Sequence, residues 1–265
     1  MFPVLFRWGD AALFTYPVIF SLAFFVGLFV WIRETRPLGI PAEKIVNLSL
    51  GVFFSGLLGA RLLFLLTQWE SFLDGSRSWI ALWEGGLVFL GGFIAAVGFL
   101  YWALPRARIP RRVAFETLTP AVAWAHAVGR WACFANGCCH GSVCPFPWAV
   151  TYTNPLSAAR PLGTPLHPSQ LYESAGLIVL GWLTHANNQK KPTERRFSSV
   201  SLYLAGYGIL RFFVEFSRGD SLRGSWMNLS TSQWISLALI FAAVLLDSSG
   251  RRDHNRLHES RNRES

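Results

Sequence analysis

Charged residues are scarce in this sequence. Asp, Glu, Lys and Arg make up 15% of the 265 residues, whereas soluble globular domains average about 25%. Several stretches with few or no charges reach about 20 residues, the length of helix that crosses a bilayer. The composition therefore excludes an ordinary soluble domain and indicates a polytopic membrane protein.

The sequence also lacks the single basic face that is typical of nucleic-acid-binding proteins. Its formal net charge is +9, but the basic residues lie in short segments between apolar runs, which is a topological signal. We therefore expect no nucleic-acid partner. No signal peptide is recognisable, so we expect the first apolar run to remain as a helix. No internal repeat is visible either, which argues against transporters built from two similar halves.

We expect an all-α integral membrane protein with about seven transmembrane helices. The apolar segments are 12–31, 47–66, 84–104, 114–134, 170–185, 199–217 and 232–247. With the N-terminus outside, most of the 24 Lys and Arg residues fall in inner loops, as the positive-inside rule requires. This predicts a multi-pass protein of the bacterial inner (plasma) membrane, with a periplasmic N-terminus and a cytoplasmic C-terminus. Residues 1–247 would form a single domain with an outer-face loop at 135–169, and we expect the charged tail 248–265 to be disordered.

Arginines inside apolar segments are the strongest candidates for a functional site. A charge within a membrane is costly, so it normally has a partner or a function. Arg130 and Arg211 fall at the outer ends of their segments, where a guanidinium group would bind two phosphate oxygens of a phospholipid head group. The alternative is neutralisation, since Glu215 follows Arg211 at the i, i+4 spacing. Arg61 is a third arginine within a predicted span.

Polar residues also enter the fifth apolar segment. After His167, the chain places Gln170, Tyr172 and Glu173 in the first turns of a predicted helix. Their spacing does not match a capping box. A polar cavity would explain them, and so would hydrogen bonds between helices, so both interpretations stay open.

All four cysteines of the chain lie close together in the sequence, at Cys133, Cys138, Cys139 and Cys144. On an oxidising face they would form disulfides or serve a plain structural role, which is the interpretation that we place first. A thiol activated by the nearby arginine would be a nucleophile, and a metal site with His140 is the third possibility. We expect no metal and no cofactor.

Several motifs follow one another in a fixed order. They are Gly59-Ala60-Arg61, residues 85–92, Gly129-Arg130 with Asn136, Gly137 and Gly141, His167–Glu173, Arg211–Glu215 with Arg218, and Ser232-Gln233-Trp234. In this order they resemble the prolipoprotein diacylglyceryl transferase family over nearly the whole chain. The resemblance implies a seven-span enzyme that transfers a diacylglyceryl group from phosphatidylglycerol to the lipobox cysteine of a prolipoprotein signal peptide. Glycerol phosphate would be released.

The resemblance also implies roles for individual residues. Arg130 and Arg211 would bind the phosphate and stabilise charge on the departing group, with Glu215 orienting Arg211. The substrate's own thiol would be the nucleophile. The residues implied to line the site are Tyr16, Arg61, Asn136, Gly141, His167, Gln170, Tyr172, Glu173 and Arg218.

This chain departs from the family pattern at four positions. Leu90 stands where the family has a histidine, and Ala132, Cys133 and Cys138 replace residues of its main signature. We therefore expect a divergent member, with another acceptor or with a replacement base: His126, His140 or His167. The alternatives are a relative that binds phospholipid without catalysis, and a transporter or sensor that uses the Cys/His cluster for metal or redox chemistry.

Overall fold

The structure is a computed structural model, and it describes residues 2–9, 11–70, 86–191, 194–218, 225–227 and 229–263. Gly85, which belongs to one of the motifs above, lies outside these residues. Seven long helices account for most of the described chain. They are α1 (Thr15–Thr35), α2 (Ala42–Thr67), α4 (Phe89–Arg106), α5 (Arg111–Asn136), α6 (Ser169–Gln189), α7 (Ser199–Glu215) and α8 (Thr231–Arg263).

Each of these helices overlaps one of the seven predicted apolar segments. Among the described residues, four helical stretches combine the length and the hydropathy that membrane crossing requires, in α1, α2, α4 and α8. Crossing by α5, α6 and α7 stays a prediction, as does disorder of the tail, which here continues α8. The described chain is thus a mostly helical membrane protein.

The all-α expectation needs a correction, because the described chain contains three short antiparallel sheets. They pair β1 (Val4–Trp8) with β2 (Ala11–Phe14), β3 (Val150–Thr151) with β4 (Pro165–Leu166), and β5 (Ser225–Trp226) with β6 (Leu229–Ser230). The first sheet takes the start of the predicted first span, so α1 begins at Thr15. Gly9 adopts a φ of 56° in the turn, a conformation that glycine favours. A short apolar run does not distinguish strand from helix by periodicity alone.

The chain divides into two compact units, Met1–Glu34 with Glu116–Ser265, and Thr35–Phe115. In the smaller unit, α2 and α4 pack along each other. A Cβ atom added at Gly91 would collide with the carbonyl oxygen of Gly59, so the two backbones are in direct contact. Small residues permit this close approach in membrane helices.

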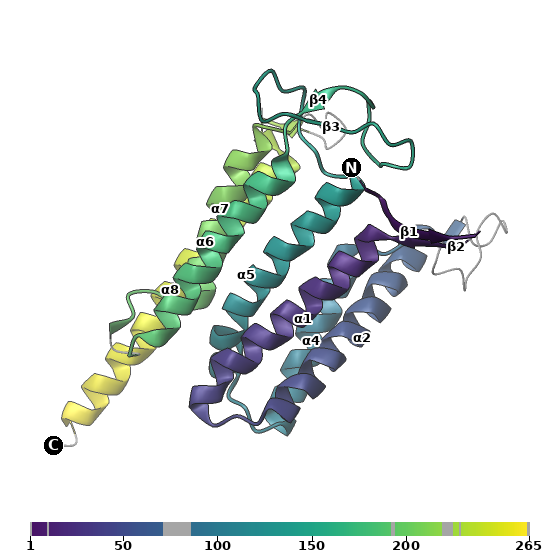
Figure 1. Ribbon diagram of the computed structural model, residues 1–265. Helices are drawn as coiled ribbons and strands as arrows, with labels where there is room; N and C mark the ends of the chain where they lie inside the picture. Colours follow the sequence, from purple (N-terminus) through teal and green to yellow (C-terminus); the bar gives the residue numbers. More distant parts are fainter. Residues whose placement is uncertain are drawn as a thin grey trace. The chain divides into compact units, whose positions relative to one another are not determined.

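In the larger unit, α7 packs between α6 and α8, and these three helices run side by side in Figure 1. α1 contacts α5, because the Trp31 indole donates to Thr117 Oγ1 at 3.2 Å. The loop that carries β3 and β4 lies where α5 ends and α6 begins (Figure 1).

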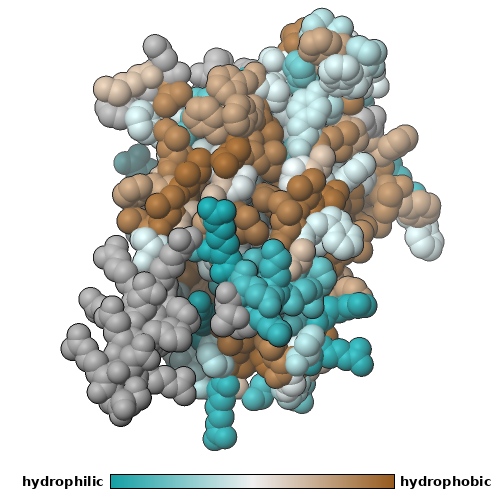
Figure 2. Space-filling model, turned by 90° about the vertical axis from the view of Figure 1, so that its left-hand side faces the viewer, coloured by the Kyte–Doolittle hydropathy of each residue, from teal (hydrophilic) through white to brown (hydrophobic). Residues whose placement is uncertain are grey.

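Large apolar side chains are exposed along the helices of both units. Phe25, Phe54, Phe213 and Phe241 are each more than half exposed. Figure 2 shows hydrophobic surface gathered over the middle of the displayed face and hydrophilic surface nearer one end. A soluble monomer rarely exposes so much contiguous apolar surface, whereas lipid covers it in a membrane.

A polar cluster joins the last residues of α1 and α6 to the start of α7 and to Glu116 of α5. Glu34 accepts hydrogen bonds from His185 and from Asn188 Nδ2, the latter at 3.0 Å. Asn188 also donates to the carbonyl of Glu116 at 2.9 Å. The Glu116 carboxylate accepts from the backbone N–H of Ser199 at 2.7 Å. This cluster lies at the opposite ends of the helices from the β3–β4 loop (Figure 1).

Candidate active site

Glu173 is the acid that holds Arg130. Arg130 lies in the last third of α5, and its Nη2 atom is 2.7 Å from Glu173 Oε1 on α6. The Glu173 side chain is 1% exposed and that of Arg130 is 17% exposed. Burial of the acid without the arginine would be very unfavourable, because an isolated ion loses its hydration. The two residues therefore form one electrostatic unit that joins two helices.

Two tyrosines and a histidine surround this ion pair. Tyr207 on α7 donates to Glu173 Oε1 at 3.0 Å, and His126 Nε2 lies 3.8 Å from the same oxygen. His126 Nδ1 is 3.3 Å from the hydroxyl of Tyr203. The rings of Tyr203 and Tyr207 stack with centroids 5.9 Å apart. His126 is thus a member of a network rather than a free base.

Arg211 pairs with Glu215 on α7. Arg211 Nη1 is 2.7 Å from Glu215 Oε2 at the i, i+4 spacing, as the sequence suggested. Ser230 Oγ donates to the other carboxylate oxygen at 2.7 Å. The phenol of Tyr207 interacts electrostatically with both Arg130 and Arg211. Each arginine therefore has a carboxylate partner, and Tyr207 lies within electrostatic range of both.

Within the described chain, Arg211 Nη1 and Glu215 Oε2 are buried and satisfied only by their ion pair. Two other buried polar atoms, on Arg130 and Gln170, have no hydrogen-bond partner among the described residues. They are Arg130 Nε, a donor, and Gln170 Oε1, an acceptor. Gln170 lies three residues before Glu173 on α6, and its Nε2 atom donates to the Cys138 carbonyl at 2.7 Å. Buried polar groups are nearly always hydrogen-bonded. An unsatisfied donor and an unsatisfied acceptor are thus available to a ligand that offers both kinds of group.

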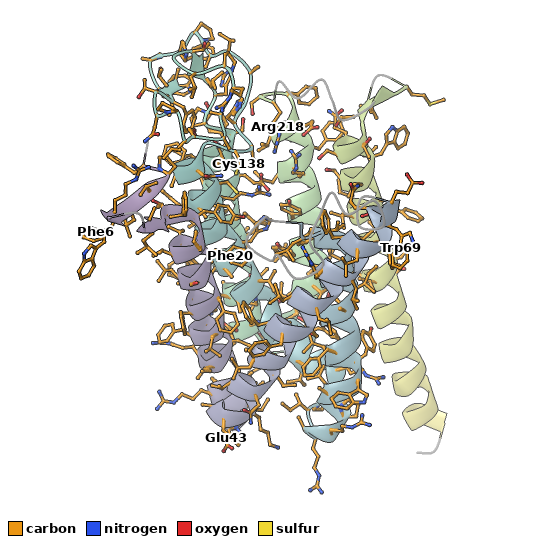
Figure 3. All side chains as sticks on the ribbon, turned by 90° about the vertical axis from the view of Figure 1, so that its right-hand side faces the viewer. Phe6, Phe20, Glu43, Trp69, Cys138 and Arg218 are labelled. Carbon is orange, nitrogen blue, oxygen red and sulfur yellow. The ribbon has the colours of Figure 1, made fainter. Side chains whose placement is uncertain are left out.

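Three thiols gather where α5 ends. Cys133, Cys138 and Cys139 place their Sγ atoms within 4.8 Å of one another, and we call them the thiol cluster. All four cysteines are free thiols, and Cys144 is fully buried outside this group. Figure 3 labels Cys138 and Arg218 at the same end of α5 and α7.

The groups around the thiol cluster shift the pKa values of its cysteines by different amounts. Hydrogen bonds from the Cys133 and Cys138 thiols lower the pKa of Cys139, and the guanidinium groups of Arg218 and Arg130 lower it further. Burial raises the pKa of Tyr152, next to the cluster, to about 12, so this phenol is a hydrogen-bond donor at neutral pH. Negative charge in the cluster is therefore expected on Cys139.

The loop after the cluster is fastened to α6 and α7. Gly141 N–H donates to the His167 carbonyl at 2.8 Å, and Ser142 N–H donates to the Ser217 carbonyl at 2.9 Å. The hydroxyls of Ser169 and Ser217 are 2.7 Å apart. A Cβ atom at Gly141 would collide with the Ser217 carbonyl, so only glycine permits this approach.

His167, at the end of this loop, and Tyr172, in the first turn of α6, form a separate small group. His167 Nδ1 lies 3.2 Å from the Tyr172 hydroxyl, which accepts a hydrogen bond from the Trp148 indole at 2.8 Å. His140 hydrogen-bonds instead to the Gly141 carbonyl through Nδ1 at 2.8 Å. Of the three histidines considered as bases, only His126 contacts the Arg130–Glu173 pair within the described chain.

The remaining predicted site residues fall into two groups. Tyr16 at the start of α1 interacts electrostatically with the thiol cluster and Arg130, and the Asn136 side chain hydrogen-bonds Cys138. Arg61 and Leu90 belong to the smaller unit. There, Arg61 Nη1 lies 3.4 Å from the Gly86 carbonyl, and Leu90 is 57% exposed.

Sequence reasoning missed Tyr203, Tyr207 and Ser217. A signal was present for the tyrosines, because they precede Arg211 and Glu215 at steps of four residues along α7. Residues at that spacing share one helical face. Ser217 gave no such signal, since its role depends on where the loop after α5 lies.

Comparison with known proteins identifies the family. A family described as prolipoprotein diacylglyceryl transferase matches residues 3–247. A phosphatidylglycerol–prolipoprotein diacylglyceryl transferase of Lactobacillus delbrueckii subsp. bulgaricus is 31% identical over 251 residues, which cover 92% of this chain and 89% of that protein. Proteins of the same name from Finegoldia magna and Clostridium tetani are 32% and 29% identical, covering 87% and 93% of this chain and 88% and 96% of theirs. With nearly its whole length matched, this chain belongs to the prolipoprotein diacylglyceryl transferase family.

Proposed function

We propose that this protein transfers a diacylglyceryl group from phosphatidylglycerol to the lipobox cysteine of a prolipoprotein, at the outer leaflet of the bacterial inner membrane. The family supports the transferase activity and both substrates. The lipobox thiol gives up its proton to solvent, and its sulfur attacks the carbon of the diacylated glycerol that bears the phosphate. A carbon–sulfur bond forms, the carbon–oxygen bond breaks, and glycerol phosphate leaves with the bonding electrons.

All seven long helices cross the membrane in this proposal, with the N-terminus outside and the C-terminus inside. The basic residues between the apolar segments support this orientation. It gives the outer side to the end of α5, the loop that carries β3 and β4, the start of α6 and the end of α7. Those are the segments that carry Arg130, the thiol cluster, Gln170 and Arg218.

The unsatisfied Nε–H of Arg130 is the observation that carries the proposal. Glu173 holds one end of the guanidinium group, while Nε is buried without an acceptor in the described part of the chain. A phosphate oxygen of phosphatidylglycerol would accept from this donor. Gln170 Oε1 would accept from a hydroxyl of the glycerol head group. The phosphate gains negative charge as the carbon–oxygen bond breaks, so the same contact strengthens in the transition state.

Other residues support the contact between Arg130 and the phosphate. Arg211, held by Glu215, adds positive charge within electrostatic range of Tyr207, which also interacts with Arg130. The residues of the larger unit that we propose to line the substrate site are Tyr16, Asn136, Gly141, His167, Gln170, Tyr172, Glu173 and Arg218.

A lipidation assay tests the proposal, with purified protein, phosphatidylglycerol and a lipobox peptide, read by mass spectrometry. Replacement Arg130→Ala should lower kcat by about 10²- to 10³-fold, as loss of one transition-state donor does in other enzymes. Arg130→Lys should recover little, because an ammonium group cannot bind Glu173 and phosphate in the same fixed geometry.

Arg112→Ala is the matched control. Arg112 lies at the start of the same helix and is exposed, so its replacement should leave kcat unchanged. Full activity of Arg130→Ala, or equal losses in the two variants, would contradict the role given to Arg130.

A further inference from the structure

The thiol cluster has the number and spacing of ligands that a zinc ion requires. Tetrahedral zinc with bonds of about 2.3 Å to sulfur places its ligand sulfurs about 3.8 Å apart. The Sγ atoms of Cys133, Cys138 and Cys139 already lie within 4.8 Å of one another. Side-chain movements of about 1 Å would therefore bring all three thiols to bonding distance.

The backbone holds the three cysteines in this arrangement. Cys133 lies in the last turns of α5, and its carbonyl accepts the N–H of Gly137 at 2.9 Å. Gly137 and Cys139 adopt positive φ angles of 82° and 61°. A non-glycine residue in that region costs about 1 kcal/mol or more, and here the turn folds Cys139 back toward Cys133. The Cys138 carbonyl is fixed by Gln170.

The site provides three protein ligands and leaves a fourth position open. Cys144 is buried elsewhere, and its N–H donates to the Pro165 carbonyl at 2.9 Å. His140 directs Nδ1 to the Gly141 carbonyl, and Nε2 lies 3.5 Å from the N–H of Arg160. Neither residue completes the set within the described chain. Structural zinc sites have four protein ligands, whereas catalytic sites keep one position for water or substrate.

We propose that Cys133, Cys138 and Cys139 bind one zinc ion, and that the acceptor cysteine of the prolipoprotein is its fourth ligand during transfer. This inference rests on the proposed function and replaces our expectation of no metal. Zinc coordination removes the proton from a thiol. The displaced water and the proton leave to solvent, and zinc changes no oxidation state.

The remaining steps balance without another reactant. The zinc-bound sulfur attacks the glycerol carbon, the carbon–sulfur bond forms, and glycerol phosphate departs with the electron pair of the carbon–oxygen bond. The product thioether is neutral and gives up the metal. Zinc with four thiolates carries two negative charges, and the guanidinium groups of Arg130 and Arg218 act on Cys139 to offset them.

Metal content and coordination are measured first, independently of activity. Full-length protein in detergent, purified with a reductant, should retain about one zinc ion per chain. Cobalt exchanged into the site should show absorption typical of tetrahedral cobalt–thiolate coordination. Adding a lipobox peptide should change that spectrum, while the same peptide with serine for cysteine should not. No stoichiometric zinc, together with three titratable thiols or a disulfide, would overturn the proposal.

Variants locate the ligands. Cys139→Ser should reduce bound zinc at least tenfold, and Cys139→His should restore binding with a shifted cobalt spectrum, because imidazole is also a zinc ligand. The matched control is Cys144→Ser, which should keep zinc. Zinc retained in all three single serine variants of the cluster would refute the assignment.

The effect on transfer separates this inference from the proposed function. A free thiol with a pKa near 8.5 is about 3% thiolate at pH 7. In zinc-free enzyme the rate should therefore rise about 16-fold from pH 7 to pH 8.5 and approach about 30-fold near pH 10. In zinc-loaded enzyme it should stay nearly flat over the same range. Equal pH profiles refute activation by zinc while transfer itself stands. Zinc binding without any lipidation refutes the proposed function while the metal site stands.

Discussion

The ion pair between Arg130 and Glu173 makes a quantitative prediction. Replacing one partner of a buried pair leaves an uncompensated charge, at a cost of about 3–5 kcal/mol. Glu173 is 1% exposed and Arg130 17%, so we expect Glu173→Gln to destabilise the protein by about 3 kcal/mol, the lower end of that range. Arg130→Gln should cost more, toward about 5 kcal/mol, because it leaves the more deeply buried carboxylate alone.

The double variant Arg130→Gln/Glu173→Gln separates charge from packing. It buries two neutral amides and leaves no uncompensated charge, so its cost should be less than the sum of the two single costs by about 2–3 kcal/mol. Unfolding in mixed detergent micelles, followed by helical circular dichroism, measures all four proteins. Glu194→Gln removes an exposed acid and should change the free energy of unfolding by less than about 0.5 kcal/mol.

Activity and lipid binding complete this test. The double variant should regain stability but not transfer, since the Arg130 guanidinium group that we assign to the phosphate is gone. Phosphatidylglycerol should stabilise Glu173→Gln more than the unaltered protein, because its phosphate supplies the missing negative charge. Purely additive stability changes, with no preferential effect of the lipid, would refute the view that the two charges depend on each other.

Three further predictions concern close contacts and the thiols. Gly141→Ala should lower the free energy of unfolding by about 1–3 kcal/mol and slow lipidation, because its Cβ would collide with the Ser217 carbonyl; denaturation and the peptide assay measure both. Gly91→Ala should separate α2 from α4 and lower the unfolding midpoint, whereas Gly98→Ala on the same helix, where no atom lies within 4 Å, should leave it unchanged or raise it. In zinc-free protein, the lowered pKa of Cys139 should keep the rate of its alkylation by iodoacetamide nearly constant from about pH 8 to about pH 6. The alkylation rate of an ordinary thiol falls about tenfold per pH unit over this range. A tenfold fall per pH unit at Cys139, measured by mass spectrometry, would show that the thiolate is absent.

Local periodicity was enough to predict the helices and one ion pair. The apolar runs overlap all seven long helices, and four of these helices are long and apolar enough to cross a membrane. Crossing by the other three stays a prediction. Arg211 and Glu215 lie on one turn of one helix, so their spacing predicts the contact. The hairpin at β1 and β2 was missed because its apolar run is too short for periodicity to decide.

Pairing between helices lay beyond the sequence. Arg130 and Glu173 meet because α5 and α6 pack with a particular rotation and height, which no single segment encodes. The contact among the three thiols of the cluster could not be predicted from the sequence either. Adjacent cysteines did not match common zinc spacings, and the left-handed turn at Gly137 and Cys139 is what brings their sulfur atoms together.

The polar cluster around Glu34 has a consequence for the order of biosynthesis. Glu34 precedes its partner His185 by 151 residues. At about 5–20 residues per second, a ribosome takes about 8 to 30 seconds to deliver that partner. During this interval, burial of the Glu34 carboxylate in lipid without its partner would cost free energy. We therefore expect the end of α1 to stay at the level of the lipid head groups. Arrival of α6 then removes that cost, and the final seating of the first helix depends on a helix made much later.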